Sequence, residues 1–190
     1  MKISSIFMSA MFSLFILQVH AQTEIPKGFK KGAITLSDGS NLSGYVKDNM
    51  RSNAAVVFIA EGKDKKTYGG AELLSAEIEE VKFICISGDF FKALCQGELC
   101  FLQKSSDASG KPTYNGNEAV FSSGTEGKLN DYFIYSNKDK QLKLISKKNI
   151  EEVAATYFAG NTAAIEKAKT INGDLSQLKE AVEIFNSESK

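Results

Sequence analysis

Short stretches in which apolar and polar residues alternate run through the first three quarters of the chain. Two of them, residues 33–36 and 42–46, flank the turn-forming cluster Asp38-Gly39-Ser40 and predict a first β-hairpin. Further strands are predicted over 54–60, near 67–68, and over 81–86, 90–94, 101–103, 119–121, 132–135 and 142–145. The connections are too short for crossover helices, so we expect a mainly antiparallel sheet that is curled or barrel-like.

The hydrophobic period changes from two to about 3.6 after residue 148, and this change predicts helices. Asn149 and Glu152 have the spacing of a capping box at the start of the first helix. Asn161 is expected to cap a second helix, and Asp174 with Gln177 to open a third. The apolar faces of these helices are expected to pack on the sheet.

Together these elements predict an α+β fold in a single domain. Antiparallel strands are expected over residues 22–147, and two to three helices over residues 148–190 that pack on the same domain. Between residues 105 and 129 the composition shifts to Ser, Gly, Asn, Thr and Lys. This shift predicts an exposed excursion from the sheet with one short strand inside it.

The N-terminus has the features of a secretory signal peptide. Lys2 precedes an apolar run over residues 6–17, and Val19-His20-Ala21 provides small residues before a cleavage site between Ala21 and Gln22. A membrane anchor is the alternative, but a helix of about 12 residues rises only about 18 Å, against about 30 Å for the hydrocarbon core. We therefore expect an exported protein, periplasmic or extracellular, with no transmembrane segment once residues 1–21 are removed.

Charge and residue usage narrow the range of functions. The 190 residues contain 23 basic and 23 acidic side chains, and removal of the signal leaves a net charge of −1 and no histidine, because His20 is the only one. Histidine-dependent catalysis is therefore excluded. Arg51 is the only arginine, and without a basic excess nucleic acid is not an expected partner. No cofactor is expected.

Two of the three cysteines are expected to form a disulfide in the oxidising compartment outside the cytoplasm. Cys95 and Cys100 flank a predicted hairpin that turns at Gly97-Glu98, with Gln96 opposite Leu99. In that register the two cysteines form a non-hydrogen-bonded pair with Cα atoms about 4.5 Å apart, close enough to bridge. A three-residue loop would offset them, and two small apolar residues in a buried strand pair remain the alternative.

Cys85 lies inside the apolar run 81–86 and is expected to be a buried core thiol. A nucleophile activated by the nearby Lys82 is the alternative. The spacing of the three cysteines contains no CxxC, so neither a metal site nor a thioredoxin-type site is predicted.

Acidic residues provide a second candidate for catalysis. Glu77 and Glu79 would share a face if both lay on a strand, and Asp89 follows shortly afterwards. A glycan hydrolase would need two carboxyl groups about 5–5.5 Å or about 6.5–9.5 Å apart in a concave site. The alternative is an ordinary solvent-exposed face of a strand. A third function, after the glycan hydrolase, is the transport of a small apolar ligand inside the sheet.

The order of these features resembles a group of secreted proteins common in Bacteroidetes-type bacteria. The resemblance covers most of residues 30–187. It is carried by Gly32-x-Ile34-x-Leu36-x-Asp38-Gly39-x-x-Leu42-x-Gly44-x-Val46, Thr67-Tyr68, Phe91-Lys92-Ala93-Leu94-Cys95-Gln96-Gly97, Tyr132-Phe133, Lys147-Lys148-Asn149 and Tyr157-Phe158. These are structural glycines and strand patterns. The family has no established activity, so the resemblance implies a compartment and an architecture but no site residues.

The segment from residue 34 to 46 is also similar to the opening of Sm-like small barrels, some of which bind RNA. The shared pattern is a turn at Asp-Gly followed by a glycine where the strand coils, and it indicates sheet curvature. The leading expectation is therefore an exported, non-enzymatic protein that binds an envelope protein or a glycan.

Overall fold

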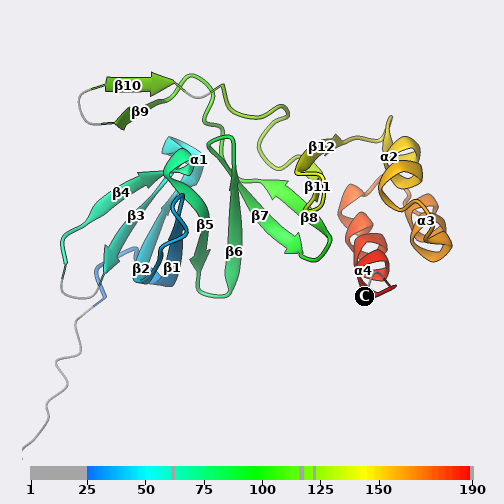
Figure 1. Cartoon of the computed structure of the whole chain (residues 1–190), viewed down its shortest axis with the longest axis horizontal. Helices are drawn as coiled ribbons and strands as arrows, with labels where there is room; N and C mark the ends of the chain where they lie inside the picture. The colour runs from blue at the N-terminus through cyan, green and yellow to red at the C-terminus, as the bar shows by residue number, and fades with distance from the viewer. Residues whose placement is uncertain (1–24, 61–62, 116–117, 122, 189–190) are drawn as a thin grey trace, which may run out of the picture.

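The structure is a computed structural model that describes residues 25–60, 63–115, 118–121 and 123–188. It is an α+β fold in which an antiparallel ten-stranded sheet is followed by helices, as the sequence predicts. The strands lie in the order β12-β11-β8-β7-β6-β5-β1-β2-β3-β4. The sheet is curled but open, with β12 and β4 at its edges (Figure 1). The predicted signal peptide and its cleavage site lie outside the described residues.

The first half of the chain contains five strands and two short helical turns. They are β1 (Lys30–Leu36), β2 (Asn41–Asn49), α1 (Met50–Asn53), β3 (Ala55–Ala60), β4 (Lys66–Gly69), η1 (Gly70–Glu72) and β5 (Leu73–Ile78). The second half adds β6 (Val81–Ile86), β7 (Asp89–Cys95), β8 (Leu99–Lys104), β9 (Pro112–Asn115), β10 (Glu118–Phe121), β11 (Tyr132–Ser136) and β12 (Gln141–Ile145). The helical region consists of α2 (Ile150–Tyr157), α3 (Thr162–Lys169), η2 (Leu175–Gln177) and α4 (Leu178–Glu188).

Strands β1 to β6 curl around a first hydrophobic core. Two glycines allow this curvature, because Gly32 and Gly44 pair across β1 and β2 and both lie against the backbone of the next strand. A Cβ atom on Gly32 would lie 2.0 Å from the carbonyl oxygen of Glu77, and one on Gly44 would lie 2.2 Å from that of Ile59. The interior of the curl is filled by side chains including Ile34, Val46, Met50, Val56, Phe58, Phe83 and Phe90.

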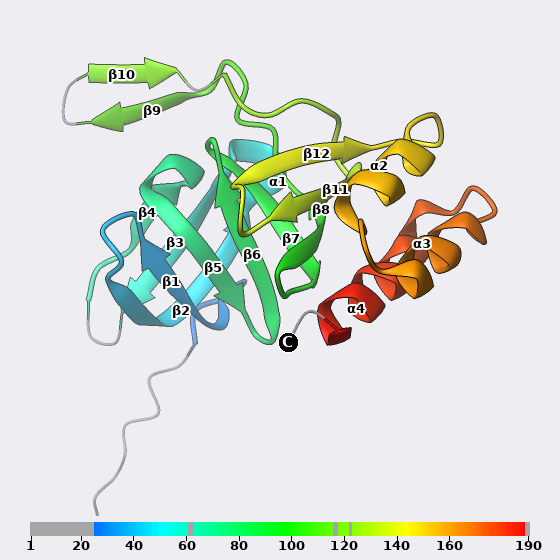
Figure 2. The ribbon, with the colours of Figure 1, turned by 45° about the vertical axis from the view of Figure 1, so that its right-hand side comes forward.

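A second core lies between the other half of the sheet and the helices (Figure 2). Phe101 and Ile134 of the sheet are fully buried there against Phe158, Leu178 and Val182. The strands and the C-terminal helices therefore share one continuous hydrophobic cluster. Among the described residues, no helix is long and apolar enough to cross a membrane.

The predicted excursion forms a two-stranded hairpin, β9 with β10, which projects from one end of the sheet (Figures 1 and 2). The sequence predicts only one of these two strands, because the other contains Pro112 and polar residues and has no clear alternation.

The helix boundaries agree with those predicted from the sequence, but one of the predicted caps does not form. Asn161 caps α3 by accepting a hydrogen bond from the Ala164 amide at 2.9 Å, as expected. The capping box of α2 does not form, because the Asn149 side chain is taken up by the preceding turn. Its Oδ1 accepts from the Ser146 amide at 2.7 Å and its Nδ2 donates to the Leu144 carbonyl at 2.9 Å.

The predicted register of the β7–β8 hairpin is also wrong. A β-bulge at Leu94 shifts the pairing, so that Cys95 lies opposite Phe101 and not opposite Cys100. Cys95 packs against the helix core, whereas Cys100 belongs to a cluster on the other side of the sheet. The expected Cys95–Cys100 disulfide is therefore absent, and all three cysteines are free thiols.

Candidate functional site

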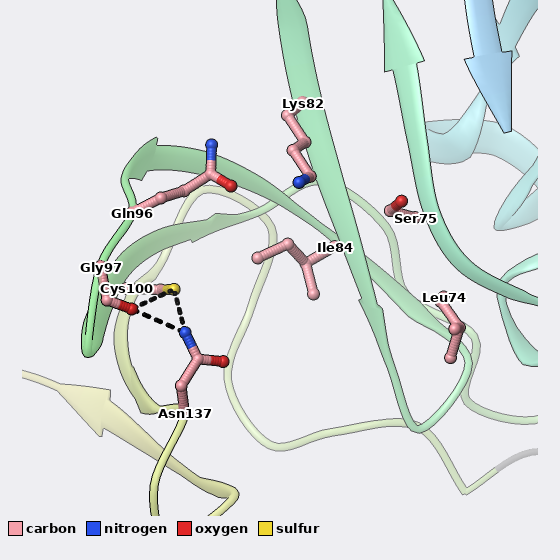
Figure 3. A pocket seen from close by; sticks show the side chains of 8 residues that line it. All are labelled: Leu74, Ser75, Lys82, Ile84, Gln96, Gly97, Cys100 and Asn137. Carbon is pink, nitrogen blue, oxygen red and sulfur yellow. Dashed lines mark hydrogen bonds between the residues drawn. The ribbon is translucent and has the colours of Figure 1, made fainter. Parts of the chain in front are cut away.

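One side of the second half of the sheet faces away from the helices, and we call it the far face. It is the side of β5 to β8, β11 and β12 that carries Ile84, Phe91, Cys100 and Phe133. A pocket of about 390 Å³ lies on it, bordered by β5, β6 and the turns of two hairpins (Figure 3). Its lining consists of Leu74, Ser75, Lys82, Ile84, Gln96, Gly97, Cys100 and Asn137.

The alternation of side chains along β6 determines which of its residues form the floor of the pocket. Lys82 and Ile84 are two residues apart on β6 and therefore point to the same face. Ser75 of β5 pairs with Ile84 and extends that face to the neighbouring strand. Leu74 precedes it at an irregularity of the ladder between β1 and β5, and its side chain remains 49% exposed at the rim.

Hydrogen bonds between the two hairpin turns fix the opposite wall. The Asn137 amide donates to the Glu98 carbonyl at 2.9 Å, which joins the β11–β12 turn to the β7–β8 turn. The Asn137 side chain donates from Nδ2 to the Gly97 carbonyl at 2.7 Å and to Cys100 Sγ at 3.4 Å. Because its donors are used in this way, Asn137 shapes the pocket more than it offers hydrogen bonds to a ligand.

The lining combines an apolar floor with one positive charge. Leu74, Ile84 and the Cys100 thiol provide the apolar surface, and Gln96 and Ser75 provide polar groups. Lys82 is exposed, stands across the ladder from Glu77, and makes no ion pair within 4 Å among the described residues. The lining includes no acidic or aromatic side chain.

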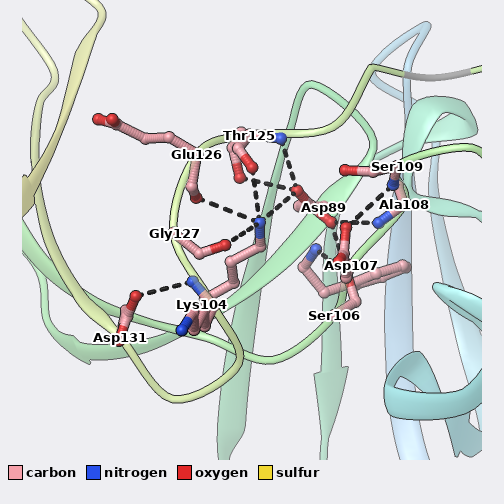
Figure 4. A network of polar contacts seen from close by, with 12 residues as sticks. Asp89, Lys104, Ser106, Asp107, Ala108, Ser109, Thr125, Glu126, Gly127 and Asp131 are labelled. Atoms are coloured by element: carbon pink, nitrogen blue, oxygen red, sulfur yellow. Dashed lines mark hydrogen bonds and ion pairs between the residues drawn. The ribbon is translucent and has the colours of Figure 1, made fainter.

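A buried ion pair lies on the same face, close to the exit of the long excursion (Figure 4). Lys104 Nζ and Asp89 Oδ2 are 3.2 Å apart, and both side chains are completely buried. Asp89 Oδ1 also accepts from the Ala108 amide at 2.7 Å, and Oδ2 accepts from the amide and the hydroxyl of Thr125 at 2.8 and 2.7 Å. Lys104 donates to the carbonyls of Thr125, Glu126 and Gly127 at 2.7 to 3.3 Å.

This arrangement holds both ends of the excursion against the sheet, and we call it the clasp. Every buried polar side-chain atom of the described residues has a hydrogen-bond partner, those of the clasp included. The Asp89 carboxylate accepts from several donors and has no free lone pair directed at a cavity. Asp89, one of the three acids predicted as catalytic, is therefore a structural group and is closed to substrate.

The other two predicted acids do not join a pocket either. Glu77 is an exposed residue of β5, which agrees with the alternative that this acid belongs to the solvent-exposed face of a strand. Glu79 is not on a strand, because it lies in the turn before β6 with a φ of 57°. Its carboxylate pairs with Lys30 at 2.9 Å, and both side chains are 56% exposed. Neither acid lines either of the two pockets described here.

Cys85 is mostly buried beside the first core, as expected. It also lines a second pocket, of about 400 Å³, with Gly70, Ser87, Gly88 and Ser123. Burial raises the pKa of the Cys85 thiol far above its ordinary value, so the thiolate needed for nucleophilic attack does not form near neutral pH. No group of three or more metal-binding side chains occurs among the described residues.

Comparisons with known proteins add no family to this geometry. No protein-family model matches the chain, and no curated protein or solved structure gives a significant match.

Proposed function

We propose that the protein is an exported, non-enzymatic binding protein of the cell envelope, and that the far-face pocket is its recognition site. The observation that carries this proposal is the half-exposed Leu74 beside an apolar floor and the ammonium of Lys82, which makes no ion pair within 4 Å among the residues that the structure describes. A pocket of about 390 Å³ is at the lower end of the range for specific ligands and can take one or two side chains. Leu74 and Ile25 are the two large hydrophobic side chains that remain exposed among the described residues, and of these Leu74 lines the pocket.

The chemistry of the lining favours a protein segment that carries an acidic group next to an apolar side chain. A carboxylate complements Lys82, which has no acidic neighbour in the lining, and an apolar side chain covers Leu74 and Ile84. Sugar rings pack by their flat faces on aromatic side chains, and this pocket provides none. A protein partner is therefore favoured over a glycan.

The two other functions considered from the sequence have less support. The candidate acids of a glycan hydrolase lie apart from the two pockets described, and Asp89 is closed inside the clasp. A carrier would need space inside the curl, where Ile34, Val46, Phe58 and Phe90 fill the first core.

An acidic and apolar pentapeptide, Leu-Glu-Leu-Glu-Leu-amide with fluorescein on its N-terminus, tests the pocket. Fluorescence anisotropy is expected to show binding that Lys82→Gln weakens by about two- to fivefold, as loss of an exposed charge pair does. Leu74→Asp, which puts a like charge at the apolar rim, is expected to weaken binding by at least about tenfold. Lys31→Gln, at an exposed residue of β1 outside the pocket, is the matched control.

The same titration distinguishes the partner classes. Equal affinity for the Gln-containing version of the peptide, or equal loss with Lys31→Gln, would contradict recognition through Lys82. Displacement of the peptide by a chitin or cellulose oligosaccharide would point to a glycan.

Export is tested on the mature N-terminus. When the full chain is expressed in a Gram-negative host and the periplasm is released by osmotic shock, N-terminal sequencing is expected to begin at Gln22. Replacing Leu14 with arginine interrupts the apolar run and is expected to leave the uncleaved chain in the cytoplasm. Retention of Met1 on a periplasmic or membrane-bound chain would contradict cleavage.

A further inference from the structure

The β7–β8 hairpin is one residue away from a regular ladder. The pairs Phe91–Lys104 and Ala93–Leu102 belong to a single register, which the bulge then interrupts. If that register continued to the turn, Cys95 would face Cys100 and Gln96 would face Leu99. The connection would then be the two residues Gly97-Glu98.

A side chain from α4 occupies the place of the missing backbone pair. The Ser105 amide donates to the Phe90 carbonyl, so every second residue of β8, Leu99 included, turns its backbone groups toward β7. The Leu99 amide instead donates to Asn186 Oδ1 at 3.0 Å, and Asn186 Nδ2 donates to the Leu99 carbonyl at 2.9 Å. The carboxamide of Asn186 thus replaces the peptide groups of Gln96.

The regular register has its own hydrogen bonds and a suitable turn. Gln96 would form both bonds with Leu99 that Asn186 now forms, so no buried backbone group would lose its partner. Glycine at the first central position is typical of a two-residue type II′ turn, and Gly97 is in that place. Gly97 now lies against Asn186, whose Cγ would be 2.3 Å from a Cβ atom at this position.

The two registers differ in where they put the thiols. In the structure Cys95 faces α4 and accepts a weak hydrogen bond from Asn186 Nδ2 at 3.6 Å, while Cys100 lies on the far face. Burial raises the pKa of Cys95, and the hydrogen bond from Asn186 partly offsets this. In the regular register Cys95 would turn to the far face, directly opposite Cys100. A non-hydrogen-bonded pair has Cα atoms about 4.5 Å apart, within the range of a disulfide.

We propose that this hairpin is a redox-sensitive switch, in which a Cys95–Cys100 disulfide selects the regular register and releases Asn186 from the sheet. The oxidant is a small-molecule or protein disulfide. Cys95 attacks it and forms a mixed disulfide with release of one thiol, and Cys100 then attacks Cys95 Sγ with release of the second thiol. The two cysteines lose two electrons, and their two protons leave with the released thiols.

The switch acts on the pocket and on α4 together. Gln96, Gly97 and Cys100 line the pocket, so a change of register alters its rim; this consequence rests on the proposed function. Loss of the Asn186 contacts loosens the docking of α4 on β7 and β8, and this consequence does not depend on any ligand.

The bond is tested in the Cys85→Ser protein, which retains only the pair in question. After equilibration with oxidised glutathione, alkylation with N-ethylmaleimide is expected to label neither cysteine, and the tryptic peptide 93–104 is expected to contain an internal disulfide. Hydrogen exchange is expected to become faster in α4, which loses the Asn186 contacts, with β1 to β3 unchanged. Two alkylated cysteines, or a bond with unchanged exchange in α4, would overturn the proposal.

Asn186→Ala distinguishes a switch from a simple oxidation. The variant removes the group that holds the bulged register, so its thiol–disulfide equilibrium constant with glutathione is expected to rise about fivefold to tenfold. Ser187→Ala, on the same helix, is expected to leave the constant unchanged because Ser187 bonds only to Ile184 of its own helix among the contacts described. An equal constant in both variants would refute the role of Asn186.

Peptide affinity measured in both redox states separates the test of the switch from the test of the pocket. If the bond and the α4 exchange appear but peptide affinity is the same in both redox states, the switch holds and its link to the pocket fails. If the peptide never binds in either state, the proposed function fails while the mass and exchange results still decide the switch.

Discussion

Replacing Lys104 with methionine is expected to lower the free energy of unfolding by about 3–5 kcal/mol, the usual cost of leaving one charge of a buried pair without its partner. The variant leaves the Asp89 carboxylate enclosed without a counter-charge and takes the donor away from three carbonyl oxygens. Urea unfolding measures the loss. Hydrogen exchange at Thr125 and Ala108 is expected to accelerate, because their amides are held by Asp89.

The exposed ion pair between Lys30 and Glu79 provides the control. Both side chains are 56% exposed, so Lys30→Met is expected to cost less than about 1 kcal/mol. Equal losses in the two lysine variants would show that the clasp does not hold the excursion. A Lys104→Met protein of unchanged stability would contradict its structural role outright.

Replacing Phe158 with alanine is expected to cost about 3–5 kcal/mol, because a fully buried phenylalanine leaves a large cavity. Phe158 lies after α2, its ring centre is 5.8 Å from that of Phe185 in α4, and it belongs to the cluster that includes Phe101 of the sheet. Since sheet and helices share this core, the variant is expected to unfold in one cooperative transition at lower urea concentration.

Tyr157→Ala is the graded control for this experiment. The Tyr157 side chain is half-buried against the same core, so its removal is expected to cost clearly less than that of Phe158. Circular dichroism and tyrosine fluorescence should give coincident unfolding curves. Two separate transitions, with the helices lost first, would contradict a single domain.

The strands were predictable because alternation is a local property. Residues 42–46 and 142–145 point to opposite faces in turn whatever else the chain does, and the structure has strands there. The Asn161 cap was predictable for the same reason. The capping box at Asn149 failed because Leu144 and Ser146 compete for the same side chain once the preceding strand is in place.

The bulge at Leu94 could not be predicted from the hairpin sequence, since a residue far along the chain stabilises it. Asn186 is 87 positions away from Leu99 and supplies both hydrogen bonds that the regular register would have made. The local pattern favoured the pairing of Cys95 with Cys100, and tertiary contacts changed it.

The clasp and the pocket have no local signature either. Asp89 and Lys104 look like ordinary polar ends of strands, although the runs Phe90-Phe91 and Phe101-Leu102 beside them give a partial signal of burial. The pocket depends on Gln96, Gly97 and Asn137 meeting across two turns, and only the strand order brings those turns together. Its floor at Lys82 and Ile84 could be assigned to one face, but not to a concave site.

The most direct test of the binding proposal is to map amide chemical shifts while the isotope-labelled protein is titrated with acetyl-Leu-Glu-Leu-Glu-Leu-amide. Binding at the far-face pocket is expected to shift the amides of Leu74, Lys82, Ile84, Gly97 and Asn137, with the helices and β1 to β3 little affected. Shifts confined to the helices or to β1 to β3, or no shift at millimolar peptide, would contradict recognition at this pocket.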